Sequence, residues 1–109
     1  MSIFKKIIDR ELPAEIVYED EFCLAFKDIQ PKAPVHLLLI PKIEIRSLAE
    51  ANENHKELLG HLLLKASEIA HQQGLDSGFQ VITNSGESVG QTVFHLHFHI
   101  LGGKKLSWP

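Results

Sequence analysis

Residues 91–101 read Gln-Thr-Val-Phe-His-Leu-His-Phe-His-Ile-Leu, so that three histidines alternate with apolar residues. Successive side chains of a β-strand point to opposite faces. The alternation therefore predicts a strand that carries His95, His97 and His99 on one face. Neighbouring imidazoles would then lie about 6.5 to 7 Å apart along the strand. A row of three titratable rings costs desolvation and adds little packing, which indicates a chemical role.

The composition indicates one globular domain spanning residues 1–109. Hydrophobic residues make up 44% of the chain, and the net charge of −3 contains no block of either sign. A basic nucleic-acid-binding surface is therefore not expected. No apolar run has the length of a signal peptide or a membrane span, and we expect a cytoplasmic protein. Cys23 is the only cysteine, which excludes an intramolecular disulfide and leads us to expect no cysteine-based zinc site.

The remaining pattern predicts an α+β fold with a mainly antiparallel sheet. Ser2 can cap a short amphipathic helix that ends by Pro13. A long helix with leucines at helical spacing should begin near residue 52 or 54 and stop at Gly74. We assign no chemistry to the histidines on that helix, His55, His61 and His71. Strands are expected at residues 16–19, 22–26, 36–40 and 79–84 and along the histidine stretch.

One chemistry that uses a row of imidazoles is metal binding. Two histidines in a His-x-His pair could bind one ion, with His36 as a third ligand at a catalytic zinc site. Three in-line rings do not easily reach one ion, and no carboxylate lies in or beside the strand to support the ligands. We therefore expect no metal and no cofactor.

The other chemistry is nucleophilic catalysis on phosphorus, because neutral imidazole is abundant near pH 7. His97, the middle ring, is the natural nucleophile, and its two neighbours can flank a phosphate. Gly90, Gln91 and Thr92 precede the strand and offer backbone N–H groups and a hydroxyl to an anion. The plain alternative is a set of surface histidines on an edge strand.

Residues 90–103 resemble the signature of the histidine triad (HIT) superfamily, His-φ-His-φ-His-φ-φ with φ apolar. Residues 26–36 read Phe-Lys-Asp-Ile-Gln-Pro-Lys-Ala-Pro-Val-His and resemble the nucleotide-binding segment of its Hint branch, the nucleoside phosphoramidases. Residues 39–42 and the closing Ser-Trp-Pro at 107–109 fit the same branch. A third histidine in place of glutamine disfavours the nucleotidyltransferase branch.

The resemblance implies a role for each histidine. His97 would be the nucleophile and carry a nucleotidyl-histidine intermediate, and His99 would contact the α-phosphate. His95 and His36 would form a supporting pair that orients the site and handles protons.

The resemblance also implies the residues that bind a purine nucleotide. Asp28 would accept hydrogen bonds from the ribose, Ile29 would lie beside the base, and Asn84 would help to hold the nucleotide. The amides around Gln91 and Thr92, next to Gly90, would contact the phosphate.

The implied activity is metal-independent hydrolysis of purine nucleoside 5′-phosphoramidates, AMP or GMP conjugates, to the monophosphate and an amine. The implied assembly is a homodimer with a HIT-like fold, joined through the long helix and a strand into one continuous sheet. The C-terminal segment around Trp108 would approach the partner's site. Two alternatives stay open: a dinucleoside polyphosphate hydrolase of the same superfamily, and a nucleotide-binding regulatory module with vestigial hydrolysis.

Overall fold

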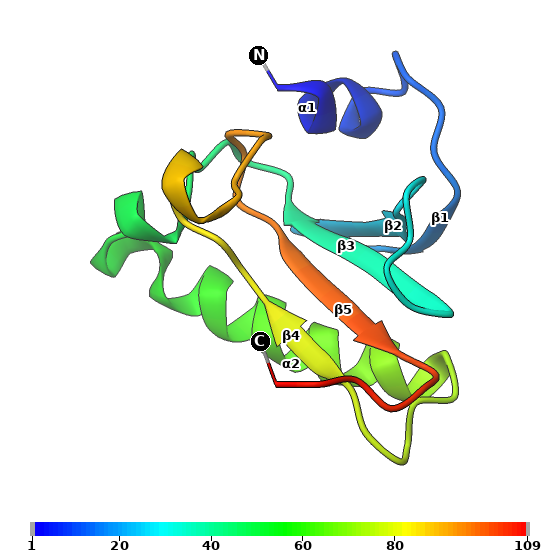
Figure 1. The fold of residues 1–109 in the computed structure, drawn as a ribbon. Coiled ribbons are helices and arrows are strands. Elements are labelled where there is room, and N and C mark those ends of the chain that lie inside the picture. Colours follow the sequence, from blue (N-terminus) through cyan, green and yellow to red (C-terminus); the bar gives the residue numbers. More distant parts are fainter. Residues whose placement is uncertain (1, 109) are drawn as a thin grey trace.

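Five strands form one sheet in the order β1-β2-β3-β5-β4, and every neighbouring pair is antiparallel (Figure 1). The computed structural model describes residues 2–108, so Pro109 of the C-terminal motif lies outside the described residues. The predicted α+β fold is confirmed. The strands are β1 Ile16–Glu19, β2 Cys23–Lys27, β3 Val35–Pro41, β4 Gln80–Ile82 and β5 Phe98–Gly102.

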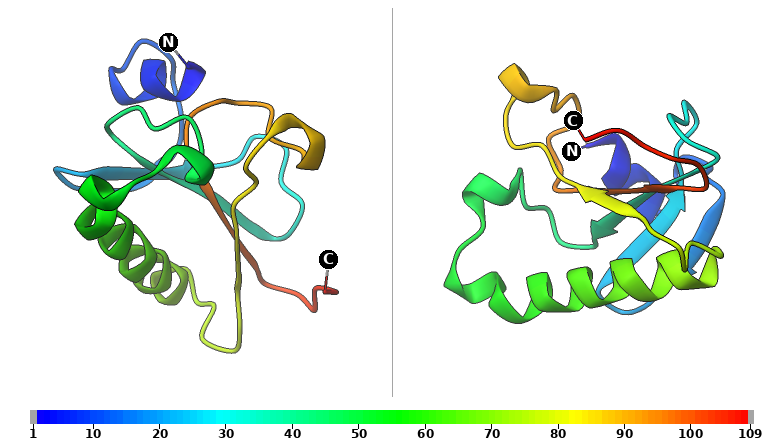
Figure 2. Two further views of the ribbon diagram at one scale, coloured as in Figure 1. Left: turned by 90° about the vertical axis from the view of Figure 1, so that its left-hand side faces the viewer. Right: turned by 60° about the horizontal axis from the view of Figure 1, so that its bottom comes forward.

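The sheet has a helix on each face (Figure 2). The long helix α2, Lys56–Gln72, packs on the face that carries Leu37 and Leu39 of β3. The short helix α1, Ile3–Ile8, packs on the opposite face through Phe4. Three one-turn 3-10 helices complete the chain: η1 Leu48–Glu50, η2 Glu53–His55 and η3 Glu87–Val89. No helix within residues 2–108 is long and apolar enough to cross a membrane.

The predicted cap of α1 is present, whereas α2 begins at Lys56 after His55, which makes no side-chain cap bond. The Ser2 hydroxyl accepts the Lys5 N–H at 3.0 Å, but α1 ends at Ile8, well before Pro13. Asn52 caps η2, which leads directly into α2. Gly74 follows the end of α2 with φ of +81°, a left-handed conformation that favours glycine.

The prediction of one strand over the whole histidine stretch is wrong for residues 91–97. β5 begins only at Phe98, because the backbone before it bonds to a loop and to side chains instead of a neighbouring strand. The Leu96 N–H donates to the Ile45 carbonyl at 2.6 Å, and the Thr83 hydroxyl donates to the His97 carbonyl at 2.7 Å.

The alternation of faces survives this irregularity. Leu96, Phe98 and Ile100 are buried in the cluster beneath α2. On the other face, His95 and His97 pack edge-on against the Phe4 ring of α1. His95 and His97 are therefore enclosed between the sheet and the N-terminal helix, which a solvated edge strand would not provide.

Candidate active site

His97 has one ring nitrogen committed to the backbone. Its Nδ1 lies 2.7 Å from the carbonyl oxygen of His95, so Nδ1 carries the proton and donates it. This assignment leaves the lone pair on Nε2. The ring is only 8% exposed, and the edge contact with Phe4, 5.0 Å between centroids, fixes its plane. A neutral, oriented imidazole with a free Nε2 lone pair is a competent nucleophile.

His95 is fully buried and is held at both ring nitrogens. Nε2 lies 2.8 Å from the Pro41 carbonyl and must donate to it, so Nδ1 is the acceptor. The Ser2 hydroxyl supplies that donor at 2.9 Å. Because the same residue's carbonyl holds His97, the ring of His95 acts as an anchor for the nucleophile.

His99 pairs with His36, and this corrects the expected pairing of His36 with His95. His36 Nε2 lies 2.9 Å from His99 Nδ1, and His36 Nδ1 accepts the Lys32 N–H at 3.0 Å. His36 therefore carries its proton on Nε2 and donates it to His99, which keeps its own proton on Nε2. The Asp28 carboxylate stands 3.3 Å from the same His36 nitrogen. His36 thus orients His99, across the pairing of β3 with β5.

All four histidines of this face are held neutral near pH 7. Burial lowers the pKa of His36, His95 and His97, with weaker opposing contributions from carboxylates or carbonyls. Burial, reinforced by the neighbouring His97 and His36, lowers the pKa of His99 to about 4. Neutrality is the state that a nucleophilic imidazole requires.

The loop before the histidines is built differently from the expected anion site. The Gly90 N–H donates to the Glu87 carbonyl and the Gln91 N–H donates to the Gly86 carbonyl, each at 3.1 Å. Both amides are engaged inside the loop, so the expectation that they face a phosphate is not met in this conformation. Thr92 is exposed at the end of the loop and remains a candidate for the anion contact.

The Gln91 side chain has a structural role that its sequence position did not indicate. It is buried, with its oxygen accepting the Gly86 N–H at 2.8 Å. Its amide nitrogen donates to the carbonyls of Arg46 at 2.8 Å and Val93 at 3.1 Å. These three bonds tie the loop before the histidines to Arg46.

The expected nucleotide-binding residues differ in whether hydrogen bonds hold their side chains. Asp28 Oδ1 accepts the Gln30 N–H at 2.9 Å, which fixes the carboxylate beside His36. Ile29 is 93% exposed. The Asn84 amide donates to the Val89 carbonyl at 3.0 Å, so it spans the η3 loop. The structure brings Asp28 to the histidines and leaves the roles of Ile29 and Asn84 toward a nucleotide as predictions.

Within residues 2–108, two groups of residues have donor atoms close enough to hold a metal. Asp28, His36 and His99 form one group, with ligand atoms within 4.8 Å of one another. This corrects the expectation that no carboxylate would lie beside the histidine strand, because the 28–34 loop folds back onto it. Asp20, Cys23 and His61 form the other, on the far side of the sheet.

Sequence reasoning missed the contribution of α1 to the site. Ser2 was recognisable as a helix cap, but its bond to His95 spans 93 positions and has no local signal. Phe4 was recognisable as an apolar helix residue, and only the fold places its ring against two histidines.

Comparison with known proteins places the chain in a family. Residues 1–107 match the family model described as scavenger mRNA decapping enzyme C-term binding. An uncharacterised HIT-like protein of Synechococcus elongatus is 57% identical over 99% of this chain and 95% of its own length. A 14 kDa zinc-binding protein of Zea mays is 50% identical over 99% of this chain and 86% of its own length.

A solved structure agrees with this relationship. The HIT family hydrolase of Clostridium thermocellum superposes with a TM-score of 0.95 at 47% identity, covering 99% of this chain and 95% of that one. The alternating histidines, the antiparallel sheet and these likenesses all agree, and the chain belongs to the histidine triad (HIT) family.

Proposed function

We propose that this protein hydrolyses purine nucleoside 5′-phosphoramidates to the nucleoside monophosphate and an amine. The observation that carries the proposal is the His97 ring, neutral, buried and held through Nδ1 so that Nε2 offers its lone pair. The Clostridium thermocellum relative is named a hydrolase, which supports the general reaction class.

The first step is attack of His97 Nε2 on phosphorus. A covalent nucleotidyl-histidine forms and the P–N bond breaks, so the leaving amine needs a proton. His99 is the proposed donor, since the bond from His36 to its Nδ1 leaves Nε2 on the opposite side of the ring. When the anionic substrate binds, the His36–His99 pair takes up one proton from solvent. His99 then gives its Nε2 proton to the amine and keeps a proton on Nδ1, while His36, with its own proton moved to Nδ1, accepts the bond between the two rings at Nε2.

The second step is hydrolysis of the intermediate. Water attacks phosphorus, the bond to His97 Nε2 breaks, and His99 takes up the proton that water releases. His97 returns to its starting tautomer because the His95 carbonyl holds its Nδ1 proton throughout. Each ring thus has one role, which agrees with their different hydrogen-bond partners.

Substrate recognition is assigned to the loops around the histidines. Asp28 would accept hydrogen bonds from the ribose hydroxyls, and the exposed Ile29 would cover the base. Thr92 and Asn84 would contact the phosphate and the nucleotide. Asp28 links recognition to chemistry, because the same carboxylate lies beside His36.

The proposed enzyme works as a homodimer. β4 is an edge strand, so its outer side can continue the sheet into a second copy. Leu63 and Leu64 of α2 are 54% and 70% exposed, and Val81 of β4 is also exposed, as an unpaired interface would be. Light scattering should give twice the monomer mass, and Leu64→Lys should reduce it.

Trapping the intermediate tests the reaction. Wild-type protein is mixed with an adenosine phosphoramidate and quenched in acid-free denaturant, and the adduct is located by mass spectrometry. We expect one AMP group on His97, no adduct in His97→Gly, and loss of turnover in His97→Ala. The surface variant His71→Gln is the matched control and should keep both. An AMP group on another residue would refute the assignment.

Two further measurements separate the alternatives. Faster turnover of diadenosine triphosphate than of the phosphoramidate would favour a dinucleoside polyphosphate hydrolase. If His97→Ala keeps both nucleotide binding and the biological effect of the protein, a regulatory module would be favoured.

The zinc-binding name of the Zea mays relative raises the question of a metal in the reaction. Asp28, His36 and His99 offer suitable donor types, but His36 and His99 already use the facing nitrogens for each other. We propose that the reaction needs no metal. Activity abolished by EDTA and restored by zinc would contradict that view.

A further inference from the structure

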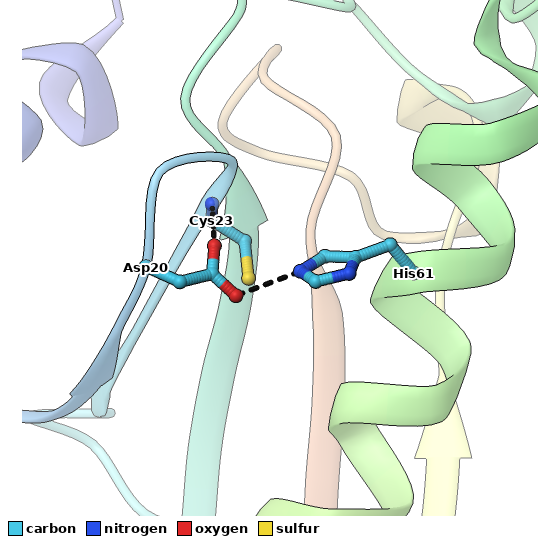
Figure 3. Close-up of side chains that lie close together, drawn as sticks. All are labelled: Asp20, Cys23 and His61. Carbon is cyan, nitrogen blue, oxygen red and sulfur yellow. Dashed lines mark hydrogen bonds and ion pairs between the residues drawn. The ribbon is translucent and has the colours of Figure 1, made fainter.

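Asp20, Cys23 and His61 converge on the face of the sheet away from His97 (Figure 3). Asp20 belongs to the turn between β1 and β2, Cys23 opens β2, and His61 lies in the second turn of α2. One donor atom from each, a carboxylate oxygen, a sulfur and an imidazole nitrogen, lies within 4.8 Å of the other two. The proposed reaction makes no use of these residues.

We propose that Asp20, Cys23 and His61 bind a divalent metal ion of the zinc class, which ties the β1–β2 turn to α2. Oxygen, thiolate and imidazole are the donors that zinc takes in proteins, and three protein ligands leave a fourth position for water. The site is separate from the histidine face, so this inference does not rest on the proposed reaction. It reverses our expectation of no cysteine-based zinc site, because the fold brings a carboxylate and an imidazole to the single cysteine.

The carboxylate is already positioned by the turn. Asp20 Oδ1 accepts the N–H groups of Phe22 at 2.8 Å and Cys23 at 2.9 Å, which directs Oδ2 toward α2. The Tyr18 hydroxyl donates to Oδ2 at 2.7 Å, as supporting hydrogen bonds do around metal ligands. The Phe22 ring meets the His61 ring edge-on, 5.3 Å between centroids. The Asp20 carboxylate therefore needs little reorientation to bind an ion.

The present spacing needs only a small expansion. Asp20 Oδ2 and His61 Nε2 are 2.7 Å apart and share a hydrogen bond. Two ligands at 2.0 to 2.2 Å from a tetrahedral zinc are about 3.4 Å apart, so the pair must open from 2.7 Å by about 0.7 Å. The His61 side chain is 29% exposed at the edge of α2 and can make that movement.

Charge and proton balance are consistent with a dication. Burial raises the pKa of the Cys23 thiol to about 12, so the ion must displace its proton: Cys–SH and M²⁺ give Cys–S–M and H⁺. Hydrogen bonds from Tyr18, Phe22 and His61 hold the pKa of Asp20 well below its usual range, despite partial burial. Carboxylate and thiolate together neutralise the ion, and His61 moves its proton to Nδ1 to offer Nε2.

Two lysines near the proposed site are each paired with a glutamate, which reduces their repulsion of a bound cation. The Lys65 ammonium, one turn along α2, lies over the Tyr18 ring and pairs with Glu68 at 3.0 Å. Lys42 on the other side pairs with Glu19 at 2.8 Å.

Cobalt titration of the full chain, free of any histidine tag, tests the site. Cys23 is the only cysteine, so a sulfur-to-cobalt charge-transfer band reports this site alone. We expect the band to saturate at one equivalent of Co²⁺ and to disappear when one equivalent of Zn²⁺ is added. Zn²⁺ should also raise the midpoint of thermal unfolding.

The variants locate the ligands. Cys23→Ser should abolish the band, and His61→Gln and Asp20→Asn should weaken cobalt binding at least tenfold. His71→Gln, which alters another α2 histidine paired with Asp76, and His99→Asn should both leave the band unchanged. Circular dichroism identifies any variant that fails to fold, and His61→Gln is the deciding one because His61 is only half-buried.

Two results would overturn the inference. The first is the absence of a charge-transfer band in the wild type at excess Co²⁺. Cobalt that binds only through histidines, and whose binding is lost in His99→Asn, counts as this result. The second is a band that keeps its full affinity in folded His61→Gln and Asp20→Asn.

Discussion

His99→Asn should make the protein less sensitive to acid. In the native state His99 Nδ1 accepts a hydrogen bond from His36, and the asparagine Oδ1 can occupy nearly the same place as an acceptor. The substitution therefore keeps the bond and removes the titrating group. Any change in the pH dependence of stability then reports the protonation of this ring.

The sign and size follow from the pKa of His99, which is about 4 when folded and near 6.5 when unfolded. Between these values the unfolded chain binds the proton more readily, so stability is full above pH 6.5 and falls as pH drops toward 4. A difference of about 2.5 pKa units corresponds to about 3 kcal/mol at 1.36 kcal/mol per unit. The remaining buried histidines add losses of the same sign in both proteins.

Urea unfolding at pH 7.0 and pH 4.0 measures the effect. The wild type should lose about 3 kcal/mol more than His99→Asn between the two pH values. Carboxylates such as Asp20, whose pKa is lowered in the fold, begin to lose their stabilising effect near pH 4, but they are the same in both proteins and cancel in the comparison. Equal losses of unfolding free energy in the two proteins would show that His99 is not buried as a neutral ring. That result would also contradict the neutral state assigned to the rings around His97.

Three other substitutions or reagents test separate parts of the fold. Ser2→Ala should lower the free energy of unfolding in urea by about 1 to 3 kcal/mol and slow phosphoramidate turnover, because it removes the helix cap and the hydrogen-bond donor to His95. Ser2→Thr keeps the hydroxyl and should retain stability and turnover. Gly102→Ala should lower stability by about 1 to 3 kcal/mol, since a Cβ would stand 2.9 Å from both methyls of Leu75; an unchanged unfolding midpoint would contradict this packing. Cys23 in the metal-free protein should react with a thiol reagent at pH 8 only after unfolding, and rapid labelling of the native chain would show that its burial is wrong.

Periodicity in the sequence was sufficient for most of the fold. The α1 cap, the long amphipathic helix and four of the five strands have local signals that need no partner. The antiparallel sheet followed from short connections between apolar runs. The three histidines could be assigned to one face because alternation depends only on the neighbouring residues.

Pairings between distant segments were beyond local signals. His36 was expected to support His95, yet β3 and β5 are aligned so that His36 stands opposite Leu101, and its ring reaches His99. Register between two strands depends on tertiary packing, and a shift of two residues changes which ring is the neighbour. The contact between Asp20 and His61, 41 positions apart, could not be predicted from the sequence for the same reason.

The late start of β5 explains why the nucleophile can be held at all. A residue inside a sheet ladder gives its carbonyl to a neighbouring strand. The His95 carbonyl is free to accept from His97 Nδ1 because residues 95–97 leave the ladder. Their remaining backbone bonds go to Ile45 and to the Thr83 hydroxyl, so the departure leaves few polar groups unpaired. A regular strand over the whole stretch would have kept the three rings aligned, but it would have taken from His97 the bond that fixes its tautomer.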